Sequence, residues 1–143
     1  MHINLESDYA VRIVNFLATE YLSDESFEGK RIDAGTIANR TSVSLRFTLK
    51  IMRKLIAAGL VKSYKGSRGG YMISKKPAQI TLRQVIEAVE GPYQFSRCMD
   101  GEYNCSCSTK EDCPFHAVYD NITKMVTDEL DKTSFDSLAV RQM

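Results

Sequence analysis

The amino-acid sequence predicts a mainly α-helical protein with one small β-hairpin and a long helix near its C-terminus. Apolar residues recur at intervals of three and four in five separate segments, which is the spacing of one face of an α-helix. Between the third and fourth segments, two short apolar runs flank a glycine-rich stretch, a pattern that indicates a hairpin. The 143 residues, 43% hydrophobic and 26% charged, fit one compact domain or a small domain with an extension, and they exclude a disordered or fibrous class.

The first helix is expected over residues 9–21, where apolar side chains share one face. Ser7 or Asp8 is the expected N-cap, because both side chains can accept a hydrogen bond from the first turn. The polar stretch 23–30 that follows predicts a loop.

Two further helices are expected between residues 33 and 59, separated by a short break at 41–43. Asp33 and Ser44 are the expected N-caps, and Gly59 is expected to end the second of these helices. The apolar stripe of that second helix is expected to consist of Leu45, Leu49, Ile51, Met52, Leu55 and Ile56. Its basic side chains gather on another sector of the helix and are Arg46, Lys50, Arg53 and Lys54.

The hairpin is expected to pair residues 60–64 with 71–74 around a glycine-rich tip. A short helix should follow at 82–89, closed by Gly91 and Pro92. After a loop at 93–113, a helix of roughly 18 residues is expected from Pro114 to about residue 131. Its apolar side chains have no evident partner in the same chain, which is typical of a helix that meets its own copy in a dimer.

The charge distribution divides the chain into two expected units. Residues 30–76 carry 12 basic side chains and one acidic side chain, whereas residues 77–143 carry 6 basic and 11 acidic ones. Such asymmetry indicates a polyanion-binding module joined to a unit with another role. We therefore expect a DNA-binding domain at 1–76, followed at 77–143 by a linker helix, a cysteine-rich sensor loop at about 93–113 and a dimerisation helix at about 114–131.

Helix, short turn, basic helix and hairpin follow one another in the order of a winged helix-turn-helix. The basic helix would enter the major groove of double-stranded DNA, where Arg46 and Lys50 reach base edges or phosphates. The hairpin tip would bring Lys65 and Arg68 to the minor groove, with glycines that permit close approach. The expected DNA-binding residues are Ser44, Arg46, Lys50, Arg53, Lys65, Ser67, Arg68 and Gly69.

The four cysteines, Cys98, Cys105, Cys107 and Cys113, lie within 16 residues. No signal peptide precedes the first helix and no apolar run is long enough to span a membrane, so the protein is expected in the reducing cytoplasm. Clustered thiols there favour metal binding or redox sensing over structural disulfides. An iron–sulfur cluster, a structural zinc ion and a metal-free thiol switch all fit this composition.

Several motifs resemble those of the Rrf family of bacterial winged-helix regulators, including its IscR, NsrR and RirA types. These motifs are Asp8-Tyr9-Ala10-Val11-Arg12, Leu55-Ile56-Ala57-Ala58-Gly59-Leu60-Val61, Gly69-Gly70-Tyr71 and the run from Leu82 to Gly91. The resemblance covers about residues 1–130. It implies a homodimer held by the long C-terminal helix, a palindromic operator, and a cluster loop that controls the DNA-binding heads.

The resemblance also implies a set of cluster ligands. Cys107 and Cys113 have the five-residue separation of the family's second and third ligands, and Cys98 would be the first. Cys105 is an alternative for the middle position, because eight residues between Cys98 and Cys107 exceed the commoner spacing. His116, three residues after Cys113, favours a two-iron cluster, whereas Asp8 donated across the dimer would favour a four-iron cluster.

No arrangement typical of an enzyme is found in the sequence. His2 and His116 are the only histidines, and no nucleophile, base and acid can be assigned around them. The glycine-rich segment 66–70 lacks the Lys-Ser/Thr ending of a phosphate-binding loop. The expected function is therefore transcription regulation and not catalysis.

Overall fold

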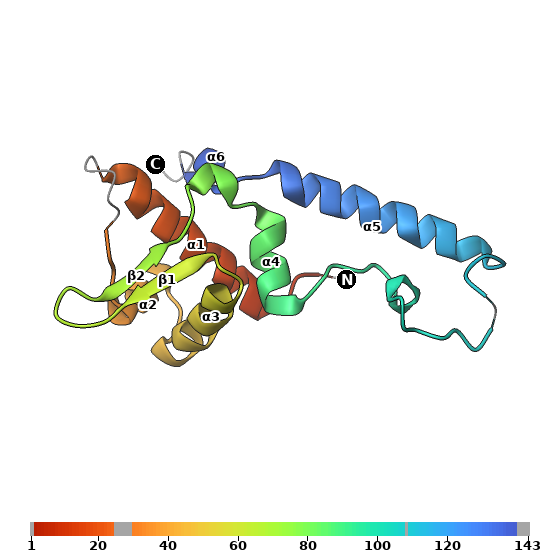
Figure 1. Ribbon diagram of the computed structural model, residues 1–143, viewed down its shortest axis with the longest axis horizontal. Helices are drawn as coiled ribbons and strands as arrows, with labels where there is room; N and C mark the ends of the chain where they lie inside the picture. The colour runs from red at the N-terminus through yellow and green to blue at the C-terminus, as the bar shows by residue number, and fades with distance from the viewer. Residues whose placement is uncertain (1, 25–29, 108, 140–143) are drawn as a thin grey trace.

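The structure, a computed structural model, describes residues 2–24, 30–107 and 109–139 of the 143-residue chain. Figure 1 shows a mostly helical molecule with one two-stranded antiparallel hairpin, which confirms the predicted fold class. The elements are α1 (Leu5–Ser23), α2 (Ala34–Thr41), α3 (Leu45–Ala57), β1 (Val61–Tyr64), β2 (Gly70–Ile73), η1 (Pro77–Gln79), α4 (Leu82–Glu90), η2 (Arg97–Met99), α5 (Pro114–Lys132) and α6 (Phe135–Ala139).

The first helix begins one turn earlier than predicted, and the predicted N-cap was wrong. Asn4 caps α1, because its side-chain oxygen accepts a hydrogen bond from the Ser7 backbone N–H at 2.8 Å. Ser7 is buried and its hydroxyl donates to Glu90 on α4, while Asp8 pairs with Arg12 at 2.6 Å. The sequence pattern missed this first turn because Leu5 is 59% exposed and does not belong to the apolar face.

The predicted caps of α2 and α3 are confirmed. The Asp33 carboxylate accepts from the Thr36 N–H at 2.9 Å, and the Ser44 hydroxyl accepts from the Phe47 N–H at 3.2 Å. Between the helices Ser42 has a φ of 56°, a left-handed conformation that ends α2 and turns the chain into α3.

The buried face of α3 differs from the predicted stripe. Thr48, Ile51, Met52 and Leu55 are buried, whereas Leu45 and Ile56 are 50% and 37% exposed. The apolar residues of this helix cover more than one face, so periodicity alone could not tell which side contacts the core. Thr48 is also buried on the side of α3 that contacts the core. Because threonine is polar, the pattern of apolar residues did not mark this position as buried.

The hairpin is anchored by a segment that the sequence did not assign to it. Val61 faces Ile73 and Tyr64 faces Gly70 in the ladder, and Ile32 forms an isolated bridge with Tyr71 on the other edge of β2. The two backbone hydrogen bonds of this bridge measure 3.0 and 2.7 Å. Gly70 has a φ of 142°, and a Cβ there would lie 2.9 Å from the Ile32 backbone, so this approach requires glycine.

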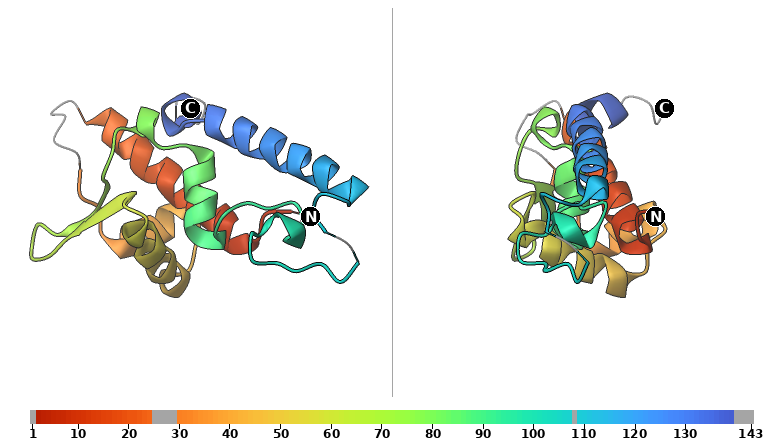
Figure 2. Two further views of the ribbon diagram at one scale, coloured as in Figure 1. Left: turned by 45° about the vertical axis from the view of Figure 1, so that its right-hand side comes forward. Right: turned by 90° about the vertical axis from the view of Figure 1, so that its right-hand side faces the viewer.

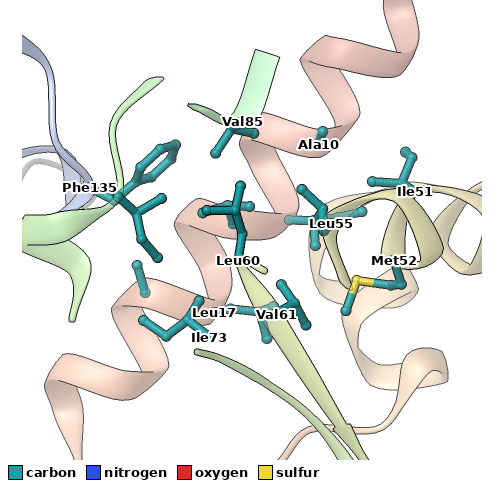
Figure 3. Packing of buried hydrophobic residues seen from close by; sticks show 14 of the residues in the cluster. Ala10, Leu17, Ile51, Met52, Leu55, Leu60, Val61, Ile73, Val85 and Phe135 are labelled. Carbon is teal, nitrogen blue, oxygen red and sulfur yellow. The ribbon is translucent and has the colours of Figure 1, made fainter. Parts of the chain in front are cut away.

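The hydrophobic core is closed by residues from both ends of the chain. Figure 3 shows Phe135 of α6 near Val85, in the same hydrophobic cluster as Leu17, Leu60 and Ile73, and the Phe135 side chain is fully buried. Backbone hydrogen bonds from Phe135 N to Ile80 O (3.1 Å) and from Leu82 N to Thr133 O (2.8 Å) hold this segment in place. The sequence did not predict α6, because five residues are too few for a periodic pattern.

The long C-terminal helix is confirmed, with α5 spanning Pro114–Lys132. Figures 1 and 2 show α5 running away from the body formed by α1 to α4, with the segment that joins α4 to α5 at its far end. The exposed apolar side chains of α5 include Phe115, Val118 and Met125, which are 62%, 54% and 63% exposed. Within the described ranges, no helix has the length and apolar character needed to cross a membrane.

Candidate DNA interface and cysteine loop

The exposed side of α3 carries the predicted DNA-binding side chains. Arg46 and Arg53 are exposed, and with Lys50 and the apolar Leu45 and Leu49 they line an open groove. Ser44 stands at the start of this helix, where its hydroxyl is used for the cap. The arrangement gives α3 a positively charged outer face above a packed inner one, as groove insertion requires.

Lys50 has a partner that sequence analysis missed. The Glu6 carboxylate of α1 lies 2.8 Å from the Lys54 ammonium and 3.3 Å from that of Lys50. Hydrogen bonding to Lys54, with a further contribution from Lys50, lowers the pKa of Glu6. Because these residues are far apart in the sequence and meet only through helix packing, no local pattern could reveal the pair. A Lys50 side chain that contacted DNA would have to exchange this carboxylate for a phosphate or a base.

Replacing Glu6 by glutamine is expected to lower the free energy of unfolding near neutral pH by about 0.5–1 kcal/mol, the range of partly exposed ion pairs. The folded-state pKa of Glu6 lies below its usual value of 4.5. Its stabilisation is therefore fully present above pH 4.5 and is lost as the pH falls through the lower folded-state pKa. Urea unfolding of the wild type and the variant across this range should show the difference shrinking in acid.

Glu129→Gln serves as the control, since this carboxylate is 76% exposed and its lysine partner is equally open. We expect the control to leave the free energy of unfolding nearly unchanged at every pH. A Glu6→Gln difference that persists undiminished far below pH 4.5 would contradict an electrostatic role for Glu6.

The hairpin tip presents the predicted wing residues to solvent. Lys65, Ser67 and Arg68 are exposed, and the Gly69 N–H donates to the Gly66 carbonyl at 2.9 Å to close the turn. A Cβ on Gly69 would lie 2.4 Å from the Tyr64 carbonyl oxygen, so this position accepts only glycine. The wing, defined here as β1, β2 and the tip between them, thus has a tight turn that carries two exposed basic side chains, Lys65 and Arg68.

The four cysteines surround one hollow in the cysteine loop, residues 93–113. Cys98 lies in η2 and Cys113 is the N-cap residue of α5, and both are half-buried. Cys105 and Cys107 are exposed, and the Cys107 N–H donates to the Cys105 sulfur at 3.4 Å. All four line the hollow together with aromatic side chains, among them Phe95, Phe115 and Tyr119.

His116 is the third residue of α5 and directly follows Phe115, but His116 itself is not among the side chains that line the hollow. Its backbone N–H donates to the Cys113 carbonyl at 3.3 Å, and its Nδ1 is buried with no hydrogen-bond partner among the described residues. Asp8 is held by Arg12 on α1 and is not among the side chains that line the hollow.

Thiolates and an imidazole are suitable ligands for an iron–sulfur cluster or for zinc, so the set of donors fits either group. In residues 2–24, 30–107 and 109–139, however, no three metal-binding side chains lie close enough to hold one ion. Ligation would therefore need the exposed part of the loop to close over Cys98 and Cys113.

Comparisons with known proteins agree with this description. The Rrf2 family model, described as an iron-dependent transcriptional regulator, matches residues 3–141. The chain is 25% identical over 142 residues to the HTH-type transcriptional regulator NsrR of Bacillus licheniformis, covering 99% of this chain and 94% of the relative. It is 32% identical over 104 residues to the HTH-type transcriptional regulator IscR of Aliivibrio salmonicida, covering 73% of this chain and 60% of the relative.

Among solved structures, the fold is similar to that of CymR (YrzC), the global cysteine regulator of B. subtilis. The TM-score is 0.76 at 23% identity, and the match covers 100% of this chain and 99% of the other. The curated relatives are transcription regulators and not enzymes, in agreement with the sequence prediction.

Proposed function

This chain belongs to the Rrf2 family of DNA-binding transcriptional regulators, and from that premise we propose that it binds a palindromic operator as a homodimer controlled by an iron–sulfur cluster in the cysteine loop. In this proposal residues 1–76 form the DNA-binding unit, and residues 77–143 hold the cluster and the dimer contact. The protein would work in the cytoplasm, where thiols remain reduced.

The observation that carries the proposal is the meeting of four cysteines around one hollow at the start of α5. Cys98, Cys107 and Cys113 would be the thiolate ligands, with Cys105 as the alternative to Cys107 and His116 or Asp8 as the fourth ligand. The buried and unpartnered Nδ1 of His116 favours His116 over Asp8. When bound, an iron–sulfur cluster supplies redox chemistry and reactivity toward oxidants.

Helix α4 provides the route from the cysteine loop to the DNA-binding face. At its C-terminal end, the Glu87 carboxylate accepts from the Tyr93 N–H at 3.0 Å, directly before the loop. On its other side the Val89 carbonyl accepts from the Lys54 ammonium at 3.4 Å. Helix α4 contacts α1, α3 and α5. Closure of the loop around a cluster would therefore move α4 and, through it, change the position of α3.

Anaerobic purification followed by an absorption spectrum and analysis of iron and acid-labile sulfide tests the cofactor. We expect a coloured protein that contains both elements and whose DNA affinity changes when the cluster is removed. A colourless protein with one zinc ion per chain would replace the cluster by a structural zinc site.

A metal-free thiol switch is the second candidate, and the exposure of Cys105 and Cys107 favours it. Oxidation of two of the thiols by a peroxide would form the S–S bond and break the O–O bond, and the two thiol protons and two electrons would pass to the peroxide, giving two molecules of water from hydrogen peroxide or an alcohol and water from an alkyl peroxide. Mass spectrometry of peroxide-treated, metal-free protein would find this disulfide, and the DNA affinity of the two forms would then differ.

Replacing Arg46 by alanine is expected to weaken operator binding more than binding to random DNA. A lost bidentate contact to a base costs roughly 1–3 kcal/mol of discrimination, or about 5- to 150-fold. Fluorescence anisotropy with an operator selected from a random library measures this ratio, and Arg53→Ala tests the neighbouring arginine in the same way. Equal losses on both DNA molecules would mean that Arg46 only contacts phosphate.

A further inference from the structure

Arg31 makes two contacts with the wing although it lies in the segment before α2. Its guanidinium carbon is 3.7 Å from the centroid of the Tyr64 ring, and its Nη1 donates to the Arg68 carbonyl at 3.3 Å. We propose that Arg31 is a positioning residue that fixes the wing tip and, through it, the contact of Arg68 with DNA. This inference rests on the proposed role of the wing in DNA binding.

The wing tip has little else to hold its direction. Strand pairing ends at Tyr64 and Gly70, and the side chains of Lys65, Ser67 and Arg68 are exposed. Within the tip, the hydrogen bond from Gly69 to Gly66 joins two residues of the turn and so does not fix the turn relative to α3. Arg31 supplies the missing link, because it contacts both Tyr64 before the turn and Arg68 within it.

Arg31 is itself held in place by its neighbour. Ile32 is only 6% exposed, and both its N–H and its carbonyl pair with Tyr71 of β2. The residue before it therefore projects from a fixed backbone beside the sheet. A planar guanidinium can stack on a ring and donate a hydrogen bond in its own plane at the same time, whereas a lysine ammonium cannot do both.

A pre-ordered tip binds DNA more tightly than a mobile one, since less conformational entropy is lost on binding. The alternative is that Arg31 neutralises a phosphate by its charge alone. The Arg31→Lys variant distinguishes the two roles. Lysine keeps the positive charge of Arg31, but it cannot stack on the Tyr64 ring and donate to the Arg68 carbonyl at the same time.

The test compares Arg31→Lys, Arg31→Ala, Arg68→Ala and the double variant Arg31→Lys/Arg68→Ala in the 143-residue chain. Arg40→Lys is the matched control, because the Arg40 guanidinium carbon lies 5.3 Å from the centroid of the Phe16 ring, which belongs to α1 and not to the wing. Affinities are measured by anisotropy over a range of salt concentrations with a duplex that the wild-type protein selects from a random library. Nitrogen-15 relaxation of Gly66 and Gly69 in the DNA-free proteins reports the order of the tip.

We expect Arg31→Lys and Arg31→Ala each to weaken binding by about fivefold, the effect of one exposed cation–π contact. The salt dependence should be unchanged for Arg31→Lys, the glycine amides should become more mobile, and Arg40→Lys should behave as the wild type. In the Arg68→Ala background the Arg31→Lys effect should disappear, because both act through one contact.

Wild-type affinity and wild-type tip order in Arg31→Lys would overturn the proposal, and so would fully multiplicative effects of Arg31→Lys and Arg68→Ala. A different result separates this inference from the proposed function. If Arg68→Ala binds DNA as the wild type does, the wing is not part of the interface, and the link from Arg31 to DNA is overturned with it. The relaxation data then test whether Arg31 orders the wing tip. A more mobile tip in Arg31→Lys supports this positioning role, and an unchanged tip overturns it.

Discussion

Replacing Cys98 or Cys113 by alanine is expected to abolish the visible absorption of the anaerobically purified protein. The structure singles out these two thiols because each is half-buried and attached to α5. Cys113 is its N-cap residue, and Cys98 lies in η2, which contacts α5. The approach to η2 is tied to the same helix by a hydrogen bond of 3.2 Å from Phe95 N to the Thr123 hydroxyl. Loss of either one leaves a single half-buried thiol beside the two exposed thiols, so a cluster would lose one of its two fixed ligands.

The remaining candidate ligands should give graded effects. Cys107→Ala is expected to remove most of the iron and sulfide. Cys105→Ala is expected to leave most of both in place. His116→Ala and Asp8→Ala should shift the spectrum without erasing it, and the buried Nδ1 of His116 predicts the larger shift for His116. Ser106→Ala, an exposed neighbour of both middle thiols, controls for a change in the loop itself. A colourless Cys105→Ala together with a coloured Cys107→Ala would reverse the assignment of the middle ligand.

Introducing aspartate at Val118 or Met125 is expected to convert the proposed homodimer into monomers. Both side chains are more than half exposed on the same side of α5, so aspartate there need not disturb the fold of one chain. Each apolar side chain buried at the contact is worth about 1.5–3 kcal/mol. In a two-fold symmetric dimer the change occurs twice, and association should weaken by roughly two to four orders of magnitude. Sedimentation velocity measures the oligomeric state directly.

Met125→Leu provides the matched control, because it keeps an apolar side chain of similar size and should leave the dimer intact. The monomeric variants should also lose tight binding to an operator with two half-sites while keeping weak binding to one half-site. Val118→Asp and Met125→Asp proteins that sediment as dimers would show that this side of α5 is not the subunit contact.

Features that depend on neighbouring residues could be predicted from the sequence. Asp33 and Ser44 cap their helices as expected, because a cap is a hydrogen bond to an N–H three residues away. The hairpin and the length of α5 were also predictable, since glycines and apolar periodicity mark them locally.

Features that depend on how helices pack could not be read from local patterns. The Asn4 cap was missed because the first turn of α1 has an exposed leucine, and the inward face of α3 was misjudged because its apolar residues surround more than one side. The Glu6 contacts with Lys50 and Lys54 and the Arg31 contacts with the wing join segments that only the fold brings together. The cysteines were recognised from their spacing, but their division into two half-buried and two exposed thiols required the structure.

The fully buried position of Phe135 has a consequence for the synthesis of this protein in the cell. The ribosome makes residue 135 after the cysteine loop and α5, so a nascent chain cannot complete its core before those segments exist. A shortened product leaves the site of this ring empty, and losing a buried phenylalanine costs about 3–5 kcal/mol, a large part of the stability of a small domain. Such products spend more time unfolded and are removed by proteases. We therefore expect that fragments ending before residue 135 do not accumulate.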